Sequence, residues 1–305
     1  MAQTTIISLD LNFLSRPQAI ASYLIRYADG AILVECGPMS TLTTLEKRLA
    51  EHGLGVKDVT HVLVTHIHLD HAGAAGALAR QGARIYVHPV GAPHVVNPEK
   101  LLASAARIYG DQMQALWGDP PFLPLPQEQL VIPQDGEAFK IGNLEFVPLS
   151  TPGHAEHHFV YLFQDICFSG DIGGVRIFPH RYIRLPMPPP EFHLEKWRQS
   201  VARLREVSFR RIAPTHFGVF DDPEWHLQAL DESLNAVESW LERVMSTDPP
   251  IEELRRQFVE WMGEQERALG LAAEVVNTYQ IANPPGMSAD GLMRYWKKYR
   301  LSQTS

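Results

Sequence analysis

The chain has 305 residues, of which 45% are hydrophobic and 20% charged, so it can bury a sizeable core in one large domain with an appendage. Its formal net charge of −8 gives no general electrostatic footprint for nucleic acid, and we expect no nucleic-acid partner. No long apolar run or signal-peptide pattern is visible and only two cysteines occur, so we expect a cytoplasmic protein without a membrane partner.

The first half of the chain alternates strand-like and helical patterns. Two apolar runs joined by an Asp-Gly turn predict a hairpin. Thr43 and Glu46 predict a capping box at the start of a helix, and Asn97 before Pro98 predicts the start of another. In chain order we expect strands over 20–27 and 31–36, a helix over 40–52, a strand over 59–64, a helix over 70–81, a strand over 83–88, a helix over 98–116 and a proline-rich loop over 117–127.

The second half begins with strands and ends with helices. A Gly-Asn pair at 142–143 predicts a hairpin, and two more strands follow before residue 170. A helix over 192–207 and a short strand over 210–214 complete this part. Beyond residue 220 we expect helices over 223–244, 251–269, 271–280 and 288–301, separated by proline-containing breaks.

The strongest functional signal is Thr-His-Ile-His-Leu-Asp-His-Ala-Gly at residues 65–73. Imidazole nitrogens and carboxylate oxygens suit a divalent cation such as zinc. His66 and His68 point the same way on an extended segment, because side chains alternate with a period of two. If a helix begins at Asp70, then Asp70 and His71 project toward a second point nearby. One short loop can therefore serve two metal ions.

Three further ligand candidates follow predicted strands downstream. His154 lies in Thr-Pro-Gly-His after the strand at 144–149, and Asp171 lies in Phe-Ser-Gly-Asp after the strand at 160–168. His216 lies in Pro-Thr-His-Phe-Gly after a short apolar run. Each candidate stands in a glycine-bearing turn at a strand end, which is where a metal could be reached.

These four segments together resemble the metallo-β-lactamase superfamily, over roughly residues 18–220 and in the same chain order. The resemblance implies an α+β fold, a four-layer αβ/βα sandwich with the metals at the edge between two sheets. Residues 1–220 would form this catalytic domain. We interpret residues 221–305 as a helical C-terminal extension packed on the sandwich, covering the pocket, forming a homodimer, or both.

The resemblance also implies the ligand set. The first metal would take His66, His68 and His154, the second would take Asp70, His71 and His216, and Asp171 would bridge both. The cofactors would be two divalent metal ions, zinc foremost, with iron or manganese as alternatives. Hydroxide bound to both metals would be the nucleophile, Asp171 would hold the pair, and Asp70 would receive a proton during turnover.

Several neighbouring residues have two interpretations. Glu35 either orients a ligand histidine or is a strand-end carboxylate. His157 and His158 follow His154 and lie near the site or pack into the sandwich, whereas His61 is expected to be an ordinary strand residue. The proline-rich segment 184–192 either overhangs the metals or connects to the helices. In the first case, the substrate wall would include Ile177, Phe178, Tyr182 and Met187.

The motifs leave the reaction open. We expect hydrolysis of an ester, thioester or lactone in a small-molecule substrate. Asp171 replaces the cysteine of first-subclass lactamases, and Thr-His-Phe-Gly at 215–218 departs from the pattern of glyoxalase II enzymes. The alternatives are a mononuclear iron persulfide dioxygenase using His66 or His68 with His154 and Asp171, a small phosphodiesterase, or a non-catalytic scaffold.

Overall fold

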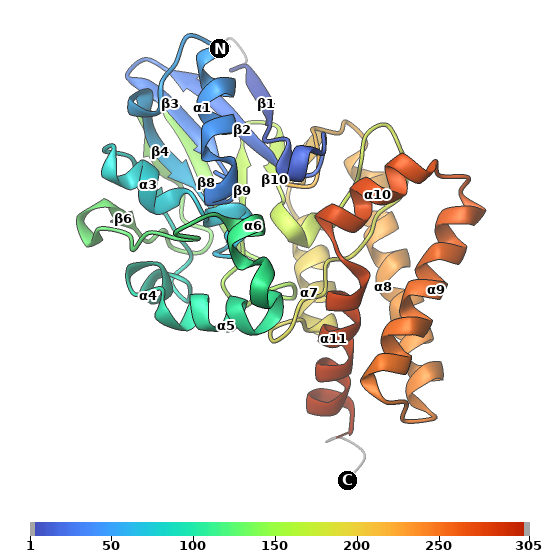
Figure 1. Ribbon diagram of the computed structural model, residues 1–305. Coiled ribbons are helices and arrows are strands. Elements are labelled where there is room, and N and C mark those ends of the chain that lie inside the picture. Colours follow the sequence, from blue (N-terminus) through green and yellow to red (C-terminus); the bar gives the residue numbers. More distant parts are fainter. Residues whose placement is uncertain (1–3, 302–305) are drawn as a thin grey trace.

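Two mixed β-sheets packed face to face form the centre of the molecule, which a computed structural model describes over residues 4–301 (Figure 1). The first sheet contains, in spatial order, β1 (Ile6–Asp10), β2 (Ala21–Tyr27), β3 (Gly30–Val34), β4 (Val59–Leu63), β5 (Arg84–Tyr86) and β6 (Leu130–Val131). The second contains β11 (Arg211–Ala213), β10 (Ile166–Phe168), β9 (Phe159–Phe163), β8 (Leu144–Ser150) and β7 (Phe139–Ile141).

Strand direction follows the length of the connections. The runs β1–β2–β3 and β7–β8–β9–β10 are antiparallel, and connections of about ten residues or fewer join their successive strands. Strands β3 to β6, and the pair β10 and β11, are parallel and have longer connections. Strands β4, β8, β10 and β11 end at the same edge of the sandwich, and the segments that follow them carry the predicted ligands.

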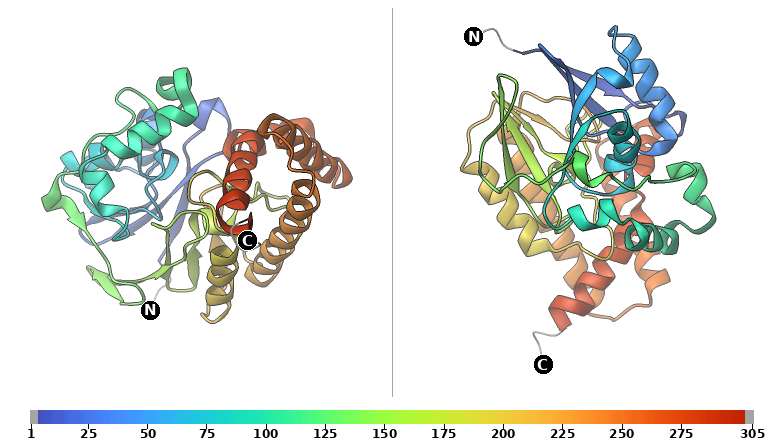
Figure 2. Two further views of the ribbon diagram at one scale, coloured as in Figure 1. Left: turned by 90° about the horizontal axis from the view of Figure 1, so that it is seen from below. Right: turned by 90° about the vertical axis from the view of Figure 1, so that its left-hand side faces the viewer.

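Helices cover the outer face of each sheet (Figure 2). The first sheet and its surroundings carry α1 (Leu42–Ala50), α2 (Leu69–Ala72), α3 (Ala75–Arg80), α4 (Ala92–Val96), α5 (Glu99–Tyr109) and α6 (Met113–Trp117). Helix α7 (Leu194–Arg205) lies on the second sheet. Its Trp197 is fully buried against the strands. Aromatic side chains such as Tyr161 and Phe163 fill the space between the sheets. The predicted four-layer αβ/βα sandwich is confirmed.

The C-terminal region is helical, as predicted, with α8 (Pro223–Met245), α9 (Ile251–Ala268), α10 (Ala273–Ala282) and α11 (Pro285–Tyr295). These helices share one hydrophobic core with α7 and with the outer face of the second sheet. A buried ion pair between Arg184 and Glu266 joins α9 to the proline-rich segment. Figure 1 shows α8, α9 and α11 side by side, next to the sandwich.

Three sequence predictions of local structure are wrong. The expected helix over 70–81 is interrupted at Gly73, because Ala74 donates its backbone hydrogen bond to the Gly37 carbonyl rather than within the helix. The helix over 98–116 is interrupted at Gly110, whose φ is +49°. Helix α1 begins at Leu42, so Thr43 lies inside the helix and no capping box forms.

A fourth prediction differs by one position, because Pro98 rather than Asn97 is the N-cap of α5, which begins at Glu99. Asn97 lies just before the cap, and its Oδ1 atom accepts a hydrogen bond from the Glu99 amide at 3.2 Å. Cys36 and Cys167 are buried free thiols. Within residues 4–301, none of the helices combines the length and the apolar character needed to cross a membrane. The expectation that the chain lacks a signal peptide rests partly on its first three residues, which lie outside the described residues.

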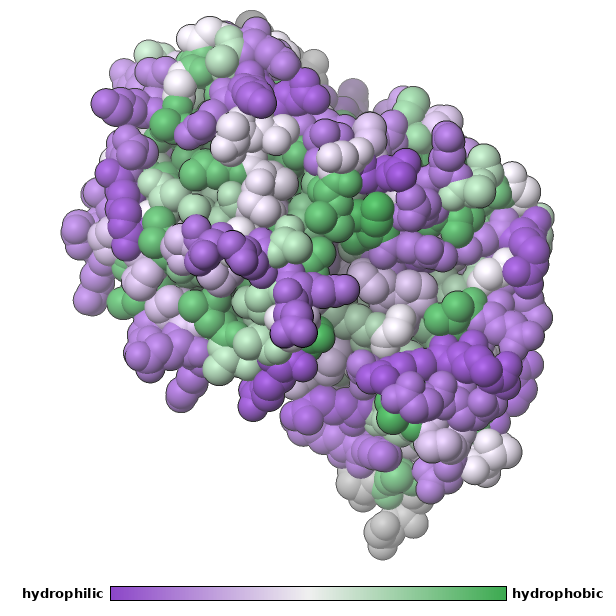
Figure 3. Space-filling model, in the orientation of Figure 1, coloured by the Kyte–Doolittle hydropathy of each residue, from purple (hydrophilic) through white to green (hydrophobic). Residues whose placement is uncertain are grey.

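Charged and polar side chains cover much of the molecular face in Figure 3. Apolar side chains gather near the middle of this face, between the half that carries α4 to α6 and the C-terminal helices.

Candidate metal centre

The seven predicted ligand residues lie together at one edge of the sandwich. They come from the segments that follow β4, β8, β10 and β11 and from the first turn of α2: His66, His68, Asp70, His71, His154, Asp171 and His216. Six of these side chains are largely buried, and that of Asp70 is 22% exposed. Residues up to 150 positions apart in the sequence thus converge on one small volume.

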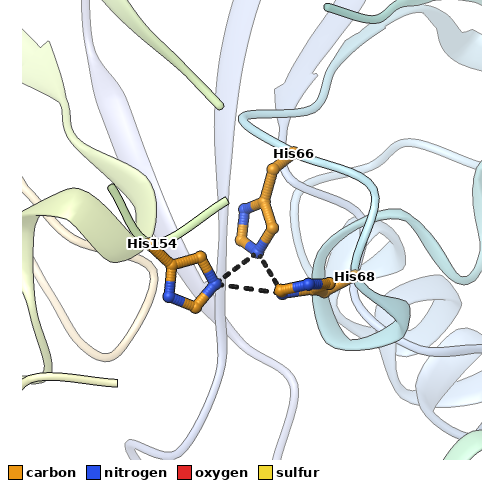
Figure 4. Close-up of side chains that lie close together, drawn as sticks. All are labelled: His66, His68 and His154. Atoms are coloured by element: carbon orange, nitrogen blue, oxygen red, sulfur yellow. Dashed lines mark hydrogen bonds between the residues drawn. The ribbon is translucent and has the colours of Figure 1, made fainter. Parts of the chain in front are cut away.

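The first cluster consists of three imidazoles whose nitrogens face one another (Figure 4). His66 Nε2 lies 2.9 Å from His68 Nδ1 and 3.2 Å from His154 Nε2. His154 Nε2 and His68 Nδ1 are 3.0 Å apart. The Oδ2 atom of Asp171 lies 3.3 Å from His154 Nε2 and adds a carboxylate to this cluster.

The second cluster lies on the other side of Asp171. Asp171 Oδ1 lies 3.3 Å from His71 Nε2 and 3.4 Å from His216 Nε2. Asp70 Oδ2 lies 3.5 Å from each of the same two nitrogens. The two oxygens of Asp171 therefore face different clusters, as expected of a bridging carboxylate.

The donor atoms fit divalent metal ions. His71 Nε2, Asp171 Oδ1 and His216 Nε2 are buried, and none has a hydrogen-bond partner within residues 4–301. Buried polar atoms without partners are rare and costly. Ligands about 2.0–2.1 Å from a tetrahedral zinc ion are separated by about 3.3 Å, close to the distances in both clusters. The side chains are thus arranged as two adjacent ligand sets.

Hydrogen bonds on the far side of three rings fix which nitrogen faces the centre. His154 Nδ1 donates to the Pro186 carbonyl at 2.8 Å, and His216 Nδ1 donates to the Ala19 carbonyl at 2.6 Å. His71 Nδ1 donates to Glu35 Oε1 at 3.2 Å. Because carbonyl and carboxylate oxygens only accept, each Nδ1 carries the proton and each Nε2 of the neutral ring presents a lone pair.

Burial keeps the first cluster neutral. It lowers the pKa of His68 to about 3 and also lowers the pKa of His66 and His154. These three imidazoles are therefore unprotonated near pH 7, which is the form that binds a metal.

In the second cluster, carboxylates favour the protonated form of the two histidines. Burial acts to lower the pKa of His71, but the negative charges of Asp70, Asp171 and Glu35 outweigh it and hold that pKa well above its usual value. The same balance, with Asp171 as the main opposing charge, raises the pKa of His216 to about 9. This half of the centre attracts positive charge, so metal binding there displaces protons.

Of the two roles that the sequence allowed for Glu35, the structure agrees with the first, in which this carboxylate orients a histidine, here His71. The Glu35 side chain is 1% exposed and its φ is +65°, a left-handed conformation that is uncommon outside glycine. Besides His71, it accepts hydrogen bonds from the Thr65 hydroxyl and from Thr215 Oγ1 at 3.1 Å. It therefore links the loops that follow β4 and β11 to one ligand histidine.

Other neighbours have distinct places. His158 accepts a hydrogen bond from the Ile172 amide at 3.4 Å and so supports the Asp171 loop. His157 faces the cavity, with its Nε2 atom 3.1 Å from Glu191 Oε2. His61 lies in β4, as expected, and its ring packs against Tyr86.

Helix α8 secures two ligand loops, a role that local sequence patterns did not indicate. His226 Nε2 donates to the Gly173 carbonyl at 2.7 Å, next to Asp171. Arg176, whose carbonyl accepts from the amide after His216, forms a two-pronged ion pair with Asp222. The signal available in the sequence was only that Asp222 and His226 lie at the start of a predicted helix.

A cavity of about 190 Å³ opens beside the centre, and His68, Asp70, His154 and Asp171 lie in its wall. The predicted substrate wall is wrong. Ile177, Tyr182 and Met187 are buried in the core shared with the C-terminal helices, and Phe178 is 58% exposed away from the cavity lining. Instead, the proline-rich segment contributes Pro186, Pro188, Pro189, Pro190 and Glu191.

Comparison with known proteins gives a match to the Metallo-beta-lactamase superfamily over residues 15–216. A metallo-beta-lactamase fold-containing protein of Sulfurisphaera tokodaii is 26% identical over 163 residues, which cover 52% of this chain and 60% of that protein. An atrochrysone carboxyl ACP thioesterase of Aspergillus fumigatus is 24% identical over 172 residues, which cover 56% of this chain and 42% of the relative. The chain thus spans only part of these relatives.

Among solved structures, a metallo-beta-lactamase family protein of Thermus thermophilus has a similar fold, with a TM-score of 0.65 and 21% sequence identity. The alignment covers 96% of this chain and 93% of that protein, so the similarity includes the C-terminal helices.

Proposed function

The chain belongs to the metallo-β-lactamase superfamily, and from that premise we propose that it is a hydrolase with two divalent metal ions, zinc in both positions, that cleaves an ester, thioester or lactone of a small molecule. The named thioesterase relative supports acyl chemistry of this kind. A small-molecule substrate and a homodimer also stay predictions of the sequence.

One observation carries the proposal. Two adjacent sets of buried nitrogens and oxygens share Asp171, and three of these atoms lack any other partner within the described chain. A mononuclear site would use only the first set and would leave the negative charge of Asp70 and Asp171 in the second set to be balanced by protons on His71 and His216 instead of by a cation. The second set therefore favours two metals over the mononuclear iron alternative.

Most of these residues would hold the metal ions, and Asp70 would also accept a proton. When bound, two divalent cations would lower the pKa of water and polarise a substrate carbonyl. Asp171 holds the two sets at a fixed separation, and the histidine rings are held by their Nδ1 hydrogen bonds. The partly exposed Asp70 carboxylate lines the cavity, where it can accept a proton during the reaction.

The test is turnover of the zinc-loaded protein on a panel of aryl esters, acyl thioesters and lactones. We expect hydrolysis of at least one class, and a loss of about 10³-fold or more in Asp171→Ala and His216→Ala. His61→Ala is the matched control, because His61 is a histidine in β4 whose ring packs on Tyr86. Unchanged turnover in His216→Ala, or oxygen consumption with a persulfide by an iron-loaded protein, would contradict the proposal.

A further inference from the structure

The cavity beside the candidate metal centre has mostly apolar walls from three separate parts of the chain. Helices α5 and α6 contribute Leu101, Ala105, Ile108, Tyr109 and Trp117, the proline-rich segment contributes four prolines, and the C-terminal region contributes Ala282 and Met287. Apart from the centre itself, six lining residues are polar or charged: His94, Lys100, Ser104, His157, Glu191 and Asn283. Such a wall suits an apolar group, because an apolar group gives up no hydrogen bonds when it leaves water.

The C-terminal wall of the cavity is held in place. Tyr109 Oη donates a hydrogen bond to Met287 Sδ at 3.4 Å and joins α5 to α11. Gly291 packs so closely on the Met187 carbonyl that a β-carbon there would lie 1.9 Å from the oxygen. Arg184 donates to the Asn283 carbonyl at 3.1 Å. The cavity is therefore lined jointly by the sandwich and the C-terminal helices, and these contacts hold its walls together.

The size of the cavity limits what it holds. An apolar protein cavity of about 150 Å³ accommodates benzene. By that measure, a cavity of about 190 Å³ holds one aromatic ring with a short linker, or an alkyl chain of about six carbons.

We propose that this cavity is an acyl-binding pocket, and that the substrate is a thioester or ester whose acyl group is a single aryl ring or a medium-length alkyl chain. The assignment rests on the proposed function, since the scissile carbonyl must reach Asp70, His154 and Asp171 in the cavity wall. It excludes small polar acyl groups as the preferred substrates, and it makes the C-terminal helices part of the specificity determinant.

The first test measures binding without turnover. The probes are the S-hexyl and S-methyl thioethers of N-acetylcysteamine, which cannot be hydrolysed, titrated calorimetrically into the zinc-loaded protein. Each buried methylene strengthens binding by about fourfold, so five methylenes in a partly open pocket should give at least about a thirtyfold preference for the hexyl probe. Equal affinity for both probes would overturn the assignment.

Matched variants locate the binding site. Ala105 is 7% exposed and lines the cavity, so Ala105→Phe should reduce the hexyl preference to less than about threefold. Ala106→Phe places the same side chain on the exposed side of the same helix and should leave the preference unchanged. Ala282→Phe fills the cavity from the opposite wall and serves if Ala105→Phe does not fold. A full hexyl preference in folded Ala105→Phe or Ala282→Phe would also overturn the assignment.

Turnover separates the two proposals. If S-hexanoyl and S-acetyl thioesters are hydrolysed equally and the thioethers bind alike, the hydrolase stands and the acyl pocket is wrong. If the hexyl thioether binds preferentially but no ester, thioester or lactone is hydrolysed, the cavity binds apolar chains, while the proposed function and the acyl substrate are both wrong.

Discussion

Replacing Glu35 with glutamine tests the centre through a residue that contacts no metal. The Oε1 atom of Glu35 accepts from His71 Nδ1, from Thr215 Oγ1 and from the Thr65 hydroxyl, while Oε2 lies 3.4 Å from the Thr65 amide. A carboxylate accepts at both oxygens, whereas an amide accepts at only one. Glu35→Gln therefore keeps the size of the side chain but creates a conflict in either orientation.

Each orientation has a defined cost. If the amide oxygen replaces Oε1, the NH₂ group meets the Thr65 N–H, and one buried group is left unsatisfied at about 1–3 kcal/mol. If the NH₂ group replaces Oε1, His71 must move its proton to Nε2 and loses the lone pair that faces Asp171. Loss of such an orienting contact lowers metal affinity about 10–100-fold, or about 1.4–2.7 kcal/mol.

The assay is competition for zinc with a chromophoric chelator, alongside urea unfolding of the metal-free protein. We expect weaker binding of one metal ion and nearly unchanged binding of the other, because Glu35 contacts only the second cluster. Glu51→Gln is the control, since Glu51 is an exposed carboxylate paired with Arg48 at 3.0 Å. A folded Glu35→Gln protein with wild-type affinity for both metals would refute the orienting role.

Three further perturbations probe the supports of the centre. Burial lowers the pKa of His226 from 6.5 to about 4, so the folded protein favours the neutral ring. This preference adds about 3 kcal/mol to the unfolding free energy above pH 6.5, and the added stability is lost as the pH falls toward 4. Urea unfolding should show this loss, and it should shrink in His226→Gln. Gly170 has a φ of +50°, and a β-carbon there would lie 2.5 Å from Thr65 Oγ1. Gly170→Ala should therefore lower the unfolding free energy by about 1–3 kcal/mol and reduce the metal content. A normal unfolding free energy together with a normal metal content would contradict this prediction. Arg184→Met leaves Glu266 buried without its ion partner and should lower the unfolding free energy by about 3–5 kcal/mol. The double variant with Glu266→Leu should recover most of this loss. An unaltered melting curve of the single variant would contradict the prediction.

The local motifs allowed the ligands to be predicted because each one lies in a few consecutive residues. His66 and His68 follow a strand, and Asp70 and His71 occupy the first turn of α2, as the sequence pattern indicated. That these residues meet His154, Asp171 and His216 was expected from the resemblance to a superfamily, since spacing alone does not bring distant strand ends together.

Features that depend on contacts between distant segments could not be predicted. The break at Gly73 comes from a hydrogen bond with Gly37, and the edge strand β1 is defined by its pairing with β2. The cavity wall depends on Tyr109 meeting Met287, 178 residues later. The proline-rich segment was correctly identified as a candidate, but its prolines, rather than the neighbouring apolar residues, face the cavity.

The most direct test of the central claim is the metal content per chain, measured by elemental analysis of protein purified without added metal or chelator. We predict about two zinc ions per chain, falling to about one in His216→Ala. About one iron per chain, unchanged in His216→Ala, would contradict the dinuclear hydrolase and favour persulfide oxidation.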